Sequence, residues 1–493
     1  MSALSAMEVD ELVEVIRGLS LPEVAPILRD LERRLTHLCD IGLEYLSLDR
    51  ETDSLSGGES ARVKMVKHLT SSLVDVAYIF DEPSVGLHPR DVHRLNELLQ
   101  KLRDKGNTVL VIEHDPAVIR IADHVVDLGP HAGSRGGEVV FQGSYDALLK
   151  APTLTGRHMK QQLPIKAGFR KPRGSISVRN VRANNLKNLS VSFPRGVFTV
   201  VTGVAGSGKS SLVHHGLVPQ HPEAIVIDQS PVGATSRSNP ATYTGIMDSV
   251  RKAFARANNV APGLFSFNSA GACETCHGLG VVYTDLAYLD EVKLPCEVCE
   301  GRRFKDEVLR YTLDGKSITD VLEMTVSQAM DYFAAEEAPA PRAAKAPRTA
   351  RTTARADATR WRADVLKVLG AMRDVGLDYL TLGQPLSTLS GGECQRIKLA
   401  GELHKEGSLY VMDEPTTGLH MSDIANLLSL INRIVDAGNT MIVIEHNLDV
   451  VRNADWIIDL GPEGGHKGGT VLFQGTPRDL VTAKDSLTAR YLS

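Results

Sequence analysis

The segment Gly203–Ser210 has the clearest chemical signature in the chain. It reads GVAGSGKS and fits the pattern G-x-x-x-x-G-K-[ST]. The glycines of this pattern let successive backbone N–H groups turn toward a phosphate, which the lysine also reaches. We therefore expect a nucleotide-phosphate site in which the Ser210 hydroxyl ligates Mg²⁺. The residues expected to line it are Gly203, Gly206, Ser207, Gly208, Lys209, Ser210 and Ser211.

Two carboxylates follow the apolar run Leu409–Met412, which has the composition of a strand. Asp413 could hold Mg²⁺ directly or through water, and Glu414 could activate an attacking water. A single Asp-Glu pair after a strand would be weak evidence, because a capped strand end has the same appearance. Here the pair recurs as Asp81 and Glu82, at nearly the same distance from an LSGGE segment, which favours the catalytic interpretation.

Two other polar side chains end predicted strands and could contact the nucleotide. His446 could touch a terminal phosphate, and His114 has the same position in an earlier, similar segment. A lone histidine would more often be structural, so the recurrence favours a catalytic function. Gln229 ends the predicted strand Ile225–Asp228 and could sense the metal and the nucleotide.

The pentapeptide LSGGE occurs twice, at residues 55–59 and 389–393. Each copy is predicted to be a glycine turn that opens a helix, where backbone N–H groups form an anion site. Because the chain already has a phosphate loop, we expect Ser56, Gly57 and Gly58 to present this second anion site across an interface.

Four of the six cysteines fall into two C-x-x-C pairs, Cys273 with Cys276 and Cys296 with Cys299. This spacing is typical of a tetrahedral zinc site with four thiolate ligands, which leaves no open position for catalysis. The sequence therefore predicts a structural Zn²⁺ ion.

These motifs belong to a duplication. Asp81 and Asp413, like His114 and His446, are separated by the same 332 positions, and DLGP and FQG also recur at this offset. Apolar strand patterns alternate with helical patterns such as residues 91–104, which predicts a mostly parallel α/β sheet. Only the second copy contains a phosphate loop.

Length and repeats suggest how the chain is divided. We expect a partial first unit (1–148), a linker (149–175), a complete second unit (176–480) and a tail (481–493). Within the second unit we expect the cysteine module at about 265–305. An exposed, partly disordered insert is expected at about 334–360, where Ala and Pro replace large apolar residues.

Composition excludes several classes of protein. No apolar stretch is long enough to span a membrane and no signal peptide is visible, so we expect a cytoplasmic protein with no membrane partner. The net charge is −5. Binding to nucleic acid would therefore need a local basic patch on an acidic body.

Together, the phosphate loop, LSGGE, DEP and histidine motifs resemble those of the ATP-binding cassette (ABC) superfamily. The segments at 227–245, 265–280, 295–304 and 443–465 resemble more closely the UvrA family, the damage-recognition subunit of bacterial excision repair. The resemblance covers nearly the whole chain. It implies an α/β P-loop NTPase of ABC type, with tandem cassettes of which the first is incomplete, and a zinc module with four cysteine ligands in the second.

The resemblance also implies what the chain does. It implies an ATPase that binds double-stranded DNA in nucleotide excision repair or in resistance to DNA-damaging compounds, and that is a subunit of an excinuclease without being the nuclease. Lys209, Glu414 and His446 would be catalytic. ATP would lie between the phosphate loop and the first LSGGE segment. Plausible DNA contacts are Arg237, Arg302, Arg303 and Lys305, although an ordinary solvated basic face has about equal weight.

The first unit departs from the family pattern, because it has no phosphate loop. We therefore expect one ATP site per chain, and either a homodimer or pairing with a chain that carries the missing part of the cassette. A UvrB-type partner is doubtful. The alternative is a truncated, non-hydrolysing fragment that binds zinc and DNA or a partner chain. A transporter ATPase shares the cassette motifs, but the cysteine module speaks against it.

Overall fold

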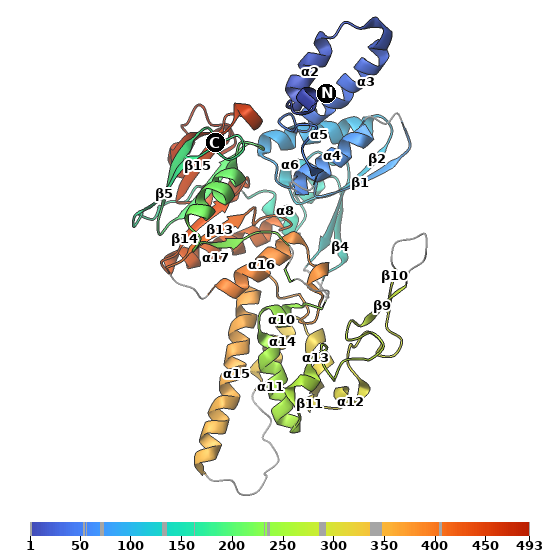
Figure 1. The fold of residues 1–493 in the computed structure, drawn as a ribbon, viewed down its shortest axis with the longest axis vertical. Coiled ribbons are helices and arrows are strands. Elements are labelled where there is room, and N and C mark those ends of the chain that lie inside the picture. Colours follow the sequence, from blue (N-terminus) through green and yellow to red (C-terminus); the bar gives the residue numbers. More distant parts are fainter. Residues whose placement is uncertain are drawn as a thin grey trace. The chain divides into compact units, whose positions relative to one another are not determined.

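The computed structural model describes residues 2–492 except for 53, 54, 56, 70–72, 131–135, 162, 231, 234–236, 285–291, 336–347 and 404–406. The chain forms two compact units, whose elements are labelled in Figure 1. The first contains Met1–His131, Arg135–Asp228 and Lys405–Ser493, and the second is mainly Gln229–His404. The boundary therefore runs through the second repeat. The serial division expected from the sequence follows the two repeats, whereas these compact units combine segments that are distant in sequence.

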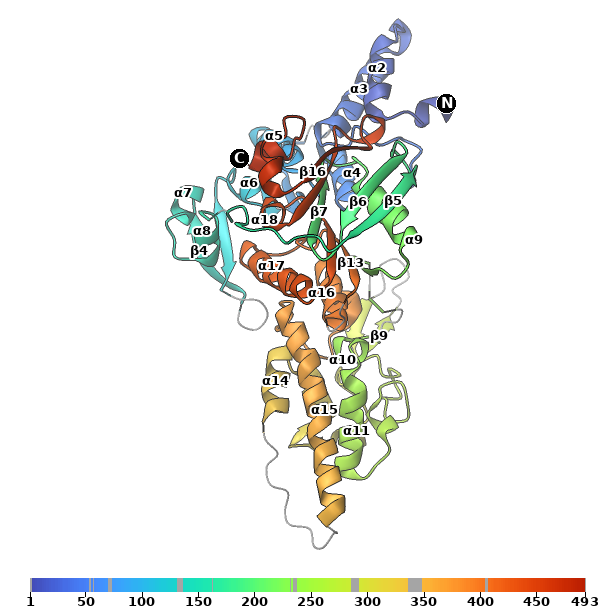
Figure 2. The ribbon, with the colours of Figure 1, turned by 90° about the vertical axis from the view of Figure 1, so that its left-hand side faces the viewer.

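A six-stranded sheet forms the centre of the first unit (Figure 2), in the order β16-β15-β7-β14-β13-β8. Neighbouring strands are parallel, except that β15 and β16 are antiparallel. The central strands are buried on both faces, which explains their continuous apolar sequences. The bounds are β7 (Phe198–Gly203), β8 (Ile225–Ile227), β13 (Leu409–Asp413), β14 (Thr440–Ile444), β15 (Trp456–Gly461) and β16 (Thr470–Gly475).

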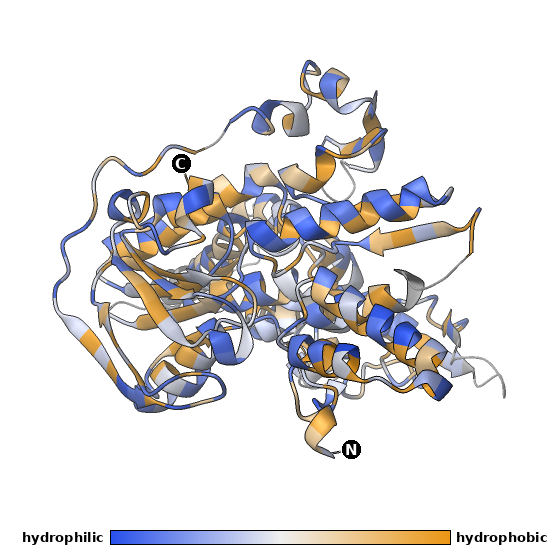
Figure 3. Ribbon diagram, turned by 90° about the horizontal axis from the view of Figure 1, so that it is seen from above, coloured by the Kyte–Doolittle hydropathy of each residue, from blue (hydrophilic) through white to orange (hydrophobic). Residues whose placement is uncertain are grey.

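Amphipathic elements complete this part of the first unit. Helix α17 (Met421–Asp436) buries Leu427, Leu428 and Ile431 on one face, and the His420 side chain caps its N-terminus. Figure 3 shows the same division, with largely hydrophobic strands and helices banded in both colours. The remaining elements are β5 (Ser175–Val181), β6 (Leu189–Pro194), the π-helical turn η4 (Ser211–Leu217), α9 (Val218–Gln220), α18 (Leu448–Asn453), α19 (Pro477–Leu480) and α20 (Ala489–Leu492).

The first repeat also lies in the first unit and reproduces part of the same plan. Its strands pair as two separate ribbons, β1 with β2 in parallel and β3 with β4 antiparallel, like β13–β14 and β15–β16. The bounds are α1 (Ser2–Ser5), α2 (Val9–Gly18), α3 (Ala25–Asp40), α4 (Gly57–Leu69), β1 (Ala77–Asp81), α5 (Pro89–Asp104), β2 (Thr108–Ile112), α6 (Pro116–Ile119), β3 (Val125–Gly129), β4 (Glu138–Gly143), α7 (Tyr145–Leu148) and α8 (Leu154–His158).

The second unit is largely helical and contains the cysteine module. Its elements are α10 (Pro240–Tyr243), α11 (Ile246–Asn258), β9 (Val281–Thr284), β10 (Val292–Pro295), α12 (Asp306–Leu309), β11 (Thr312–Leu313), β12 (Lys316–Ser317), α13 (Ile318–Glu323), α14 (Val326–Ala334), α15 (Arg348–Asp374) and α16 (Gly391–Glu402). Among all described residues, no helix is long and apolar enough to cross a membrane.

The segment 334–360, expected to be an exposed insert, is only partly described. Residues 336–347 lie outside the described residues, whereas residues 348–360 form the first turns of α15. Alanine and arginine have high helix propensity, so a composition that lacks large apolar side chains also suits an extended helix.

Candidate nucleotide and metal sites

The phosphate loop follows β7 directly, as the sequence predicts. Lys209 is buried, and its Nζ donates hydrogen bonds to the backbone oxygens of Gly203, at 3.1 Å, and Val204, at 2.8 Å. Burial lowers the pKa of Lys209 to about 8, against the opposing effect of the nearby carboxylates of Glu414 and Asp413. The lysine is therefore held inside the loop, where phosphates could replace the two carbonyl oxygens as its partners.

The two carboxylates end β13, close to this lysine. Asp413 Oδ2 lies 3.1 Å from His214 Nε2, and Glu414 Oε1 lies 3.5 Å from His446 Nε2. Burial raises the pKa of Glu414 to about 7, and Asp413 raises it further, whereas the positive charge of Lys209 opposes them. Burial also lowers the pKa of His446 well below its ordinary value, so this ring is neutral at pH 7. The structure therefore brings Lys209, Asp413, Glu414 and His446 together.

A buried glutamate organises this edge of the sheet. The Glu445 carboxylate accepts hydrogen bonds from the backbone N–H groups of Thr416, at 3.0 Å, and His446, at 2.6 Å. It thereby joins the loop after β13 to the loop after β14. Glu113 makes the matching bonds to Ser84, at 2.8 Å, and His114, at 2.9 Å. The repetition of the Glu-His pair was visible in the sequence, but the structural role of the glutamate was not.

Residues of the first repeat complete the surroundings of the phosphate loop. A Cβ atom on Gly206, whose φ is +70°, would lie only 2.8 Å from the Tyr45 ring. The Tyr45 hydroxyl donates a hydrogen bond to Glu59, the last residue of the first LSGGE segment. Gly57 and Gly58 begin α4, while Ser56 lies outside the described residues. The start of α4 is therefore tied, through Tyr45, to the phosphate loop of the second repeat.

Two more residues of the first repeat approach the Glu414 carboxylate. A Cβ atom on Gly86 would lie 3.1 Å from Glu414 Oε2, so a side chain there would be in unusually tight contact with this carboxylate. Arg62, on α4, is buried, and its positive charge lowers the pKa of both Glu414 and His446. Tyr45, Arg62 and Gly86 were missed by the sequence analysis. Their only signal is that each recurs in the second copy, as Tyr379, Arg396 and Gly418.

The corresponding residues of the first repeat have a similar arrangement. Glu82 Oε1 lies 3.3 Å from His114 Nε2, and a Cβ atom on Gly418 would lie 3.6 Å from Glu82. Each repeat thus places a glycine against the glutamate of the other. The sequence contains no second phosphate loop to accompany Asp81 and Glu82.

Gln229 and the second LSGGE segment belong to the second unit. Gln229 follows β8, and its Oε1 lies 3.3 Å from the position that a Cβ atom on Gly391 would occupy. Ser390 caps α16 in a reciprocal arrangement with Glu393. The predicted helix after this glycine turn is therefore present.

The four cysteines of the second unit converge. Their sulfur atoms all lie within 4.8 Å of one another, with 4.0 Å between Cys273 and Cys296 and 3.6 Å between Cys276 and Cys299. A tetrahedron with Zn–S bonds of about 2.3 Å has sulfur atoms about 3.8 Å apart. Gly278 follows the first pair with φ +78°, where a Cβ atom would overlap the Phe267 carbonyl oxygen. The donor set and its spacing fit a structural Zn²⁺ ion.

Comparisons with known proteins identify the family of this chain. A family model described as ABC transporter matches residues 302–417. UvrABC system protein A of Thermus thermophilus is 45% identical, over 99% of this chain and 53% of its own length. The protein of that name from Aquifex aeolicus is also 45% identical, over 98% of this chain and 53% of its own. The chain belongs to the UvrA family.

A solved structure supports the same assignment. The crystal structure of UvrA2 from Deinococcus radiodurans matches all of this chain and 63% of its own, with a TM-score of 0.89 and 40% identity. The fold is accordingly that of an ABC-type P-loop ATPase. This UvrA-family chain spans about half the length of the curated relatives that it matches.

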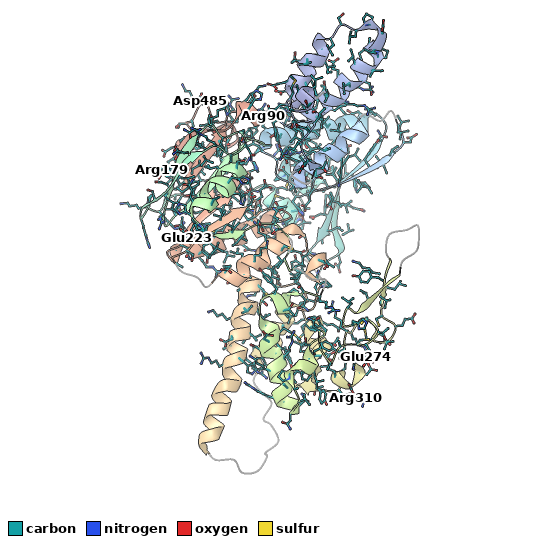
Figure 4. The ribbon with its side chains drawn as sticks, viewed as in Figure 1. Arg90, Arg179, Glu223, Glu274, Arg310 and Asp485 are labelled. Atoms are coloured by element: carbon teal, nitrogen blue, oxygen red, sulfur yellow. The ribbon has the colours of Figure 1, made fainter. Side chains whose placement is uncertain are left out.

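The basic residues predicted to contact DNA all make contacts within the second unit of this UvrA-family chain. Arg302 lies 3.4 Å from Glu300 and 3.5 Å from Asp306. Lys305 Nζ lies 2.5 Å from Glu274, which is labelled in Figure 4. The structure therefore gives these two cations exposed carboxylate partners rather than buried ones.

The other two basic residues differ in their surroundings. The Arg303 guanidinium lies over the Phe267 ring, 5.7 Å from its centre. Arg237 donates a hydrogen bond of 3.3 Å to Asn268. Arg303 is thus part of the packing of the cysteine module, while Arg237 has a neutral partner.

Proposed function

We propose that this chain is a UvrA-type ATPase that couples ATP hydrolysis to binding of double-stranded DNA. Its biological task would be damage recognition in nucleotide excision repair or resistance to DNA-damaging compounds, as a subunit of an excinuclease that is not itself the nuclease. The observation that carries this proposal is the contact between repeats: Tyr45 and Gly86 lie against the phosphate loop and Glu414 of the second repeat. The curated relatives support the repair assignment by their name.

The side chains around the phosphate loop support the proposal of ATP hydrolysis. Lys209 would bind the terminal phosphates, and His446, neutral and buried, could donate a hydrogen bond to the γ-phosphate. Ser210 and Asp413 offer the hydroxyl and carboxylate oxygens that suit Mg²⁺, which would supply positive charge to the phosphate oxygens. Glu414 would orient and deprotonate the attacking water. Its pKa of about 7 suits a general base at neutral pH.

The repeat offers a matched test of this role. Glu414→Gln should lower the ATP hydrolysis rate by about 10²- to 10⁴-fold, the usual contribution of a general base. Nucleotide affinity should remain, because the phosphate loop is intact. Steady-state ATPase assays and nucleotide-binding titrations measure the two effects separately.

Glu82→Gln is the control for that test. Glu82 has the same type, the same left-handed backbone and the same histidine neighbour, but no phosphate loop accompanies it in this chain. Equal losses of hydrolysis in the two variants would contradict the assignment of Glu414 as the base of the Lys209 site.

DNA binding would use half-buried cations beside the cysteine module, whose carboxylate partners are exposed. Exposed ion pairs contribute only about 0–1 kcal/mol, so Arg302 and Lys305 could exchange their carboxylates for phosphates at little cost. The double variant Arg302→Ala with Lys305→Ala should weaken duplex binding and reduce the salt dependence of log K by about 0.9 for each lost phosphate contact. Fluorescence anisotropy at several salt concentrations measures both quantities.

Arg373→Ala, which removes an exposed cation from α15, is the control for the DNA experiment. An unchanged salt dependence in the double variant would show that these cations belong to an ordinary solvated surface. Stimulation or inhibition of ATPase activity by duplex DNA, in the unmodified chain, tests the coupling itself.

The sheet of the first repeat suggests the nature of a partner. In the second repeat β7 lies between β14 and β15, but among the described residues no strand lies between β2 and β3. Leu110, Ile112, Val126 and Leu128 are 53%, 54%, 54% and 65% exposed, whereas their counterparts Ile442, Ile444, Ile458 and Leu460 are 0%, 0%, 0% and 1% exposed.

An exposed apolar surface of this kind is typical of a site that binds another polypeptide segment. We infer that it accepts a parallel strand which, like β7, leads into a phosphate loop. That strand would be supplied by a polypeptide segment outside this sequence and would give Asp81, Glu82 and His114 a nucleotide. A homodimer of the chain is the competing hypothesis for the assembly.

A further inference from the structure

A buried chain of hydrogen bonds connects three distant segments of the first unit. His88 Nε2 lies 3.2 Å from Thr488 Oγ1, and the Thr488 hydroxyl donates a hydrogen bond of 3.1 Å to Asp459 Oδ1. All three residues are at most 1% exposed. The contact joins residue 88 of the first repeat to residues near the C-terminal end of the second.

The donors and acceptors in this His88–Thr488–Asp459 chain have a single consistent order. His88 Nδ1 accepts a hydrogen bond of 3.2 Å from the backbone N–H of Arg90, which is labelled in Figure 4. Burial lowers the pKa of His88 well below its ordinary value, so the ring is neutral. Its proton is therefore on Nε2 and is donated to Thr488, whose own proton goes to Asp459. None of these three side chains can rotate without losing a buried hydrogen bond.

The two residues at the ends of this series of hydrogen bonds, His88 and Asp459, both lie beside the proposed ATP site. His88 lies two residues after Gly86, whose close approach to Glu414 was described above. Its ring also meets the His446 ring edge-on, with 6.4 Å between their centres. Asp459 lies on β15 opposite Thr202, next to the start of the phosphate loop.

The same arrangement occurs a second time, with the repeats exchanged. Thr155 Oγ1 lies 3.0 Å from His420 Nε2 and donates a hydrogen bond of 2.8 Å to Asp127 Oδ1. His420 lies two residues after Gly418, which approaches Glu82. The recurrence argues that the His-Thr-Asp order belongs to the repeated unit and is not an accident of packing.

We propose that Thr488 and Asp459 are positioning residues for ATP hydrolysis, which act through His88 to hold Gly86 against the Glu414 carboxylate. This inference rests on the proposed ATPase function. In the absence of the Thr488 hydroxyl, His88 loses its acceptor, and the segment 84–88 is held at its start, by the bond from the Ser84 N–H to Glu113, but no longer at His88. The Glu414 carboxylate can then turn away from the water that it must orient, while the phosphate loop, which binds the nucleotide, keeps its own contacts.

Thr488→Val tests this in the full chain, because valine keeps the shape of threonine and removes the hydroxyl. Ser486, which donates a hydrogen bond of 2.5 Å to Asp459 Oδ2, would still satisfy part of the carboxylate. We expect kcat to fall about tenfold, with KM and nucleotide affinity within about twofold of the unmodified chain. Thr488→Ser should restore kcat to within about threefold. Thr155→Val is the matched control and should leave kcat unchanged.

A double-mutant cycle separates positioning from loss of stability. Gly86→Ala disturbs the Glu414 contact directly, so Thr488→Val should add little to its effect on kcat. If the effects of Gly86→Ala and Thr488→Val on kcat multiply in the double variant, the two residues act independently and the inference is overturned. An unchanged kcat in Thr488→Val would also overturn it, as would an equal loss of kcat in Thr155→Val. Loss of turnover together with nucleotide affinity and melting temperature would show a structural role and also overturn it. An unmodified chain that binds ATP without turnover would overturn both this inference and the proposed function, whereas turnover insensitive to Thr488 overturns the inference alone.

Discussion

Lys209→Ala should abolish ATP binding and hydrolysis. The Lys209 ammonium is the buried cation of the phosphate loop, and it donates only to the backbone oxygens of Gly203 and Val204 among the bonds described for it. Charge-assisted hydrogen bonds contribute about 1.5–3 kcal/mol each, so losing those to the phosphates should weaken binding by at least a hundredfold. Equilibrium binding of a fluorescent ATP analogue and ATPase assays measure the loss.

Folding should survive this substitution. Burial lowers the pKa of Lys209 to about 8, so the folded state holds the charged form at a cost while no phosphate is bound. Removal of the charge therefore should not lower the melting temperature. Lys150→Ala, at an exposed position, is the control for the loss of a lysine as such. The unmodified chain should bind one nucleotide. Two nucleotides per isolated chain, or nucleotide retained by Lys209→Ala, would contradict the single-site expectation.

The phosphate loop and the cysteine module were predictable from the sequence because each is a local pattern. The glycines and lysine of residues 203–210 follow a strand and precede a helical turn, and the structure reproduces this order. The spacing within and between the C-x-x-C pairs anticipated four sulfur atoms close enough for one metal. In both cases the chemistry depends on residues that are near in sequence or held by short turns.

The contacts between the repeats could not be predicted in the same way. Tyr45, Gly86 and Thr488 acquire their roles only when segments hundreds of residues apart meet, and none carries a distinctive local pattern. The boundary of the compact units was missed for a related reason. Parallel strands β7, β13 and β14 are adjacent in space but distant in sequence, so the cysteine module and its helices enter as a long insertion between β8 and β13.

Zinc binding should contribute strongly to the folding stability of the cysteine module in the second unit. Its four cysteines are buried and form a cluster of their own. Phe267 and Phe304 pack beside the cysteines as a ring pair, with 6.1 Å between their centres, but the thiolates themselves need a metal to hold them together. A structural zinc site contributes on the order of 10 kcal/mol, which exceeds the usual margin between a folded and an unfolded small module.

Cys296→Ser should therefore remove the metal and unfold the module around it. We expect about one zinc per unmodified chain and none in the variant, with new protease cleavage within residues 266–305 and weaker DNA binding. Metal analysis and limited proteolysis followed by mass spectrometry measure these changes. Cys39→Ser, outside the C-x-x-C pairs, should keep the zinc. Nucleotide binding at Lys209 should persist in both variants, because the phosphate loop belongs to the first unit; a zinc-free unmodified chain with an intact module would refute the structural role of the metal.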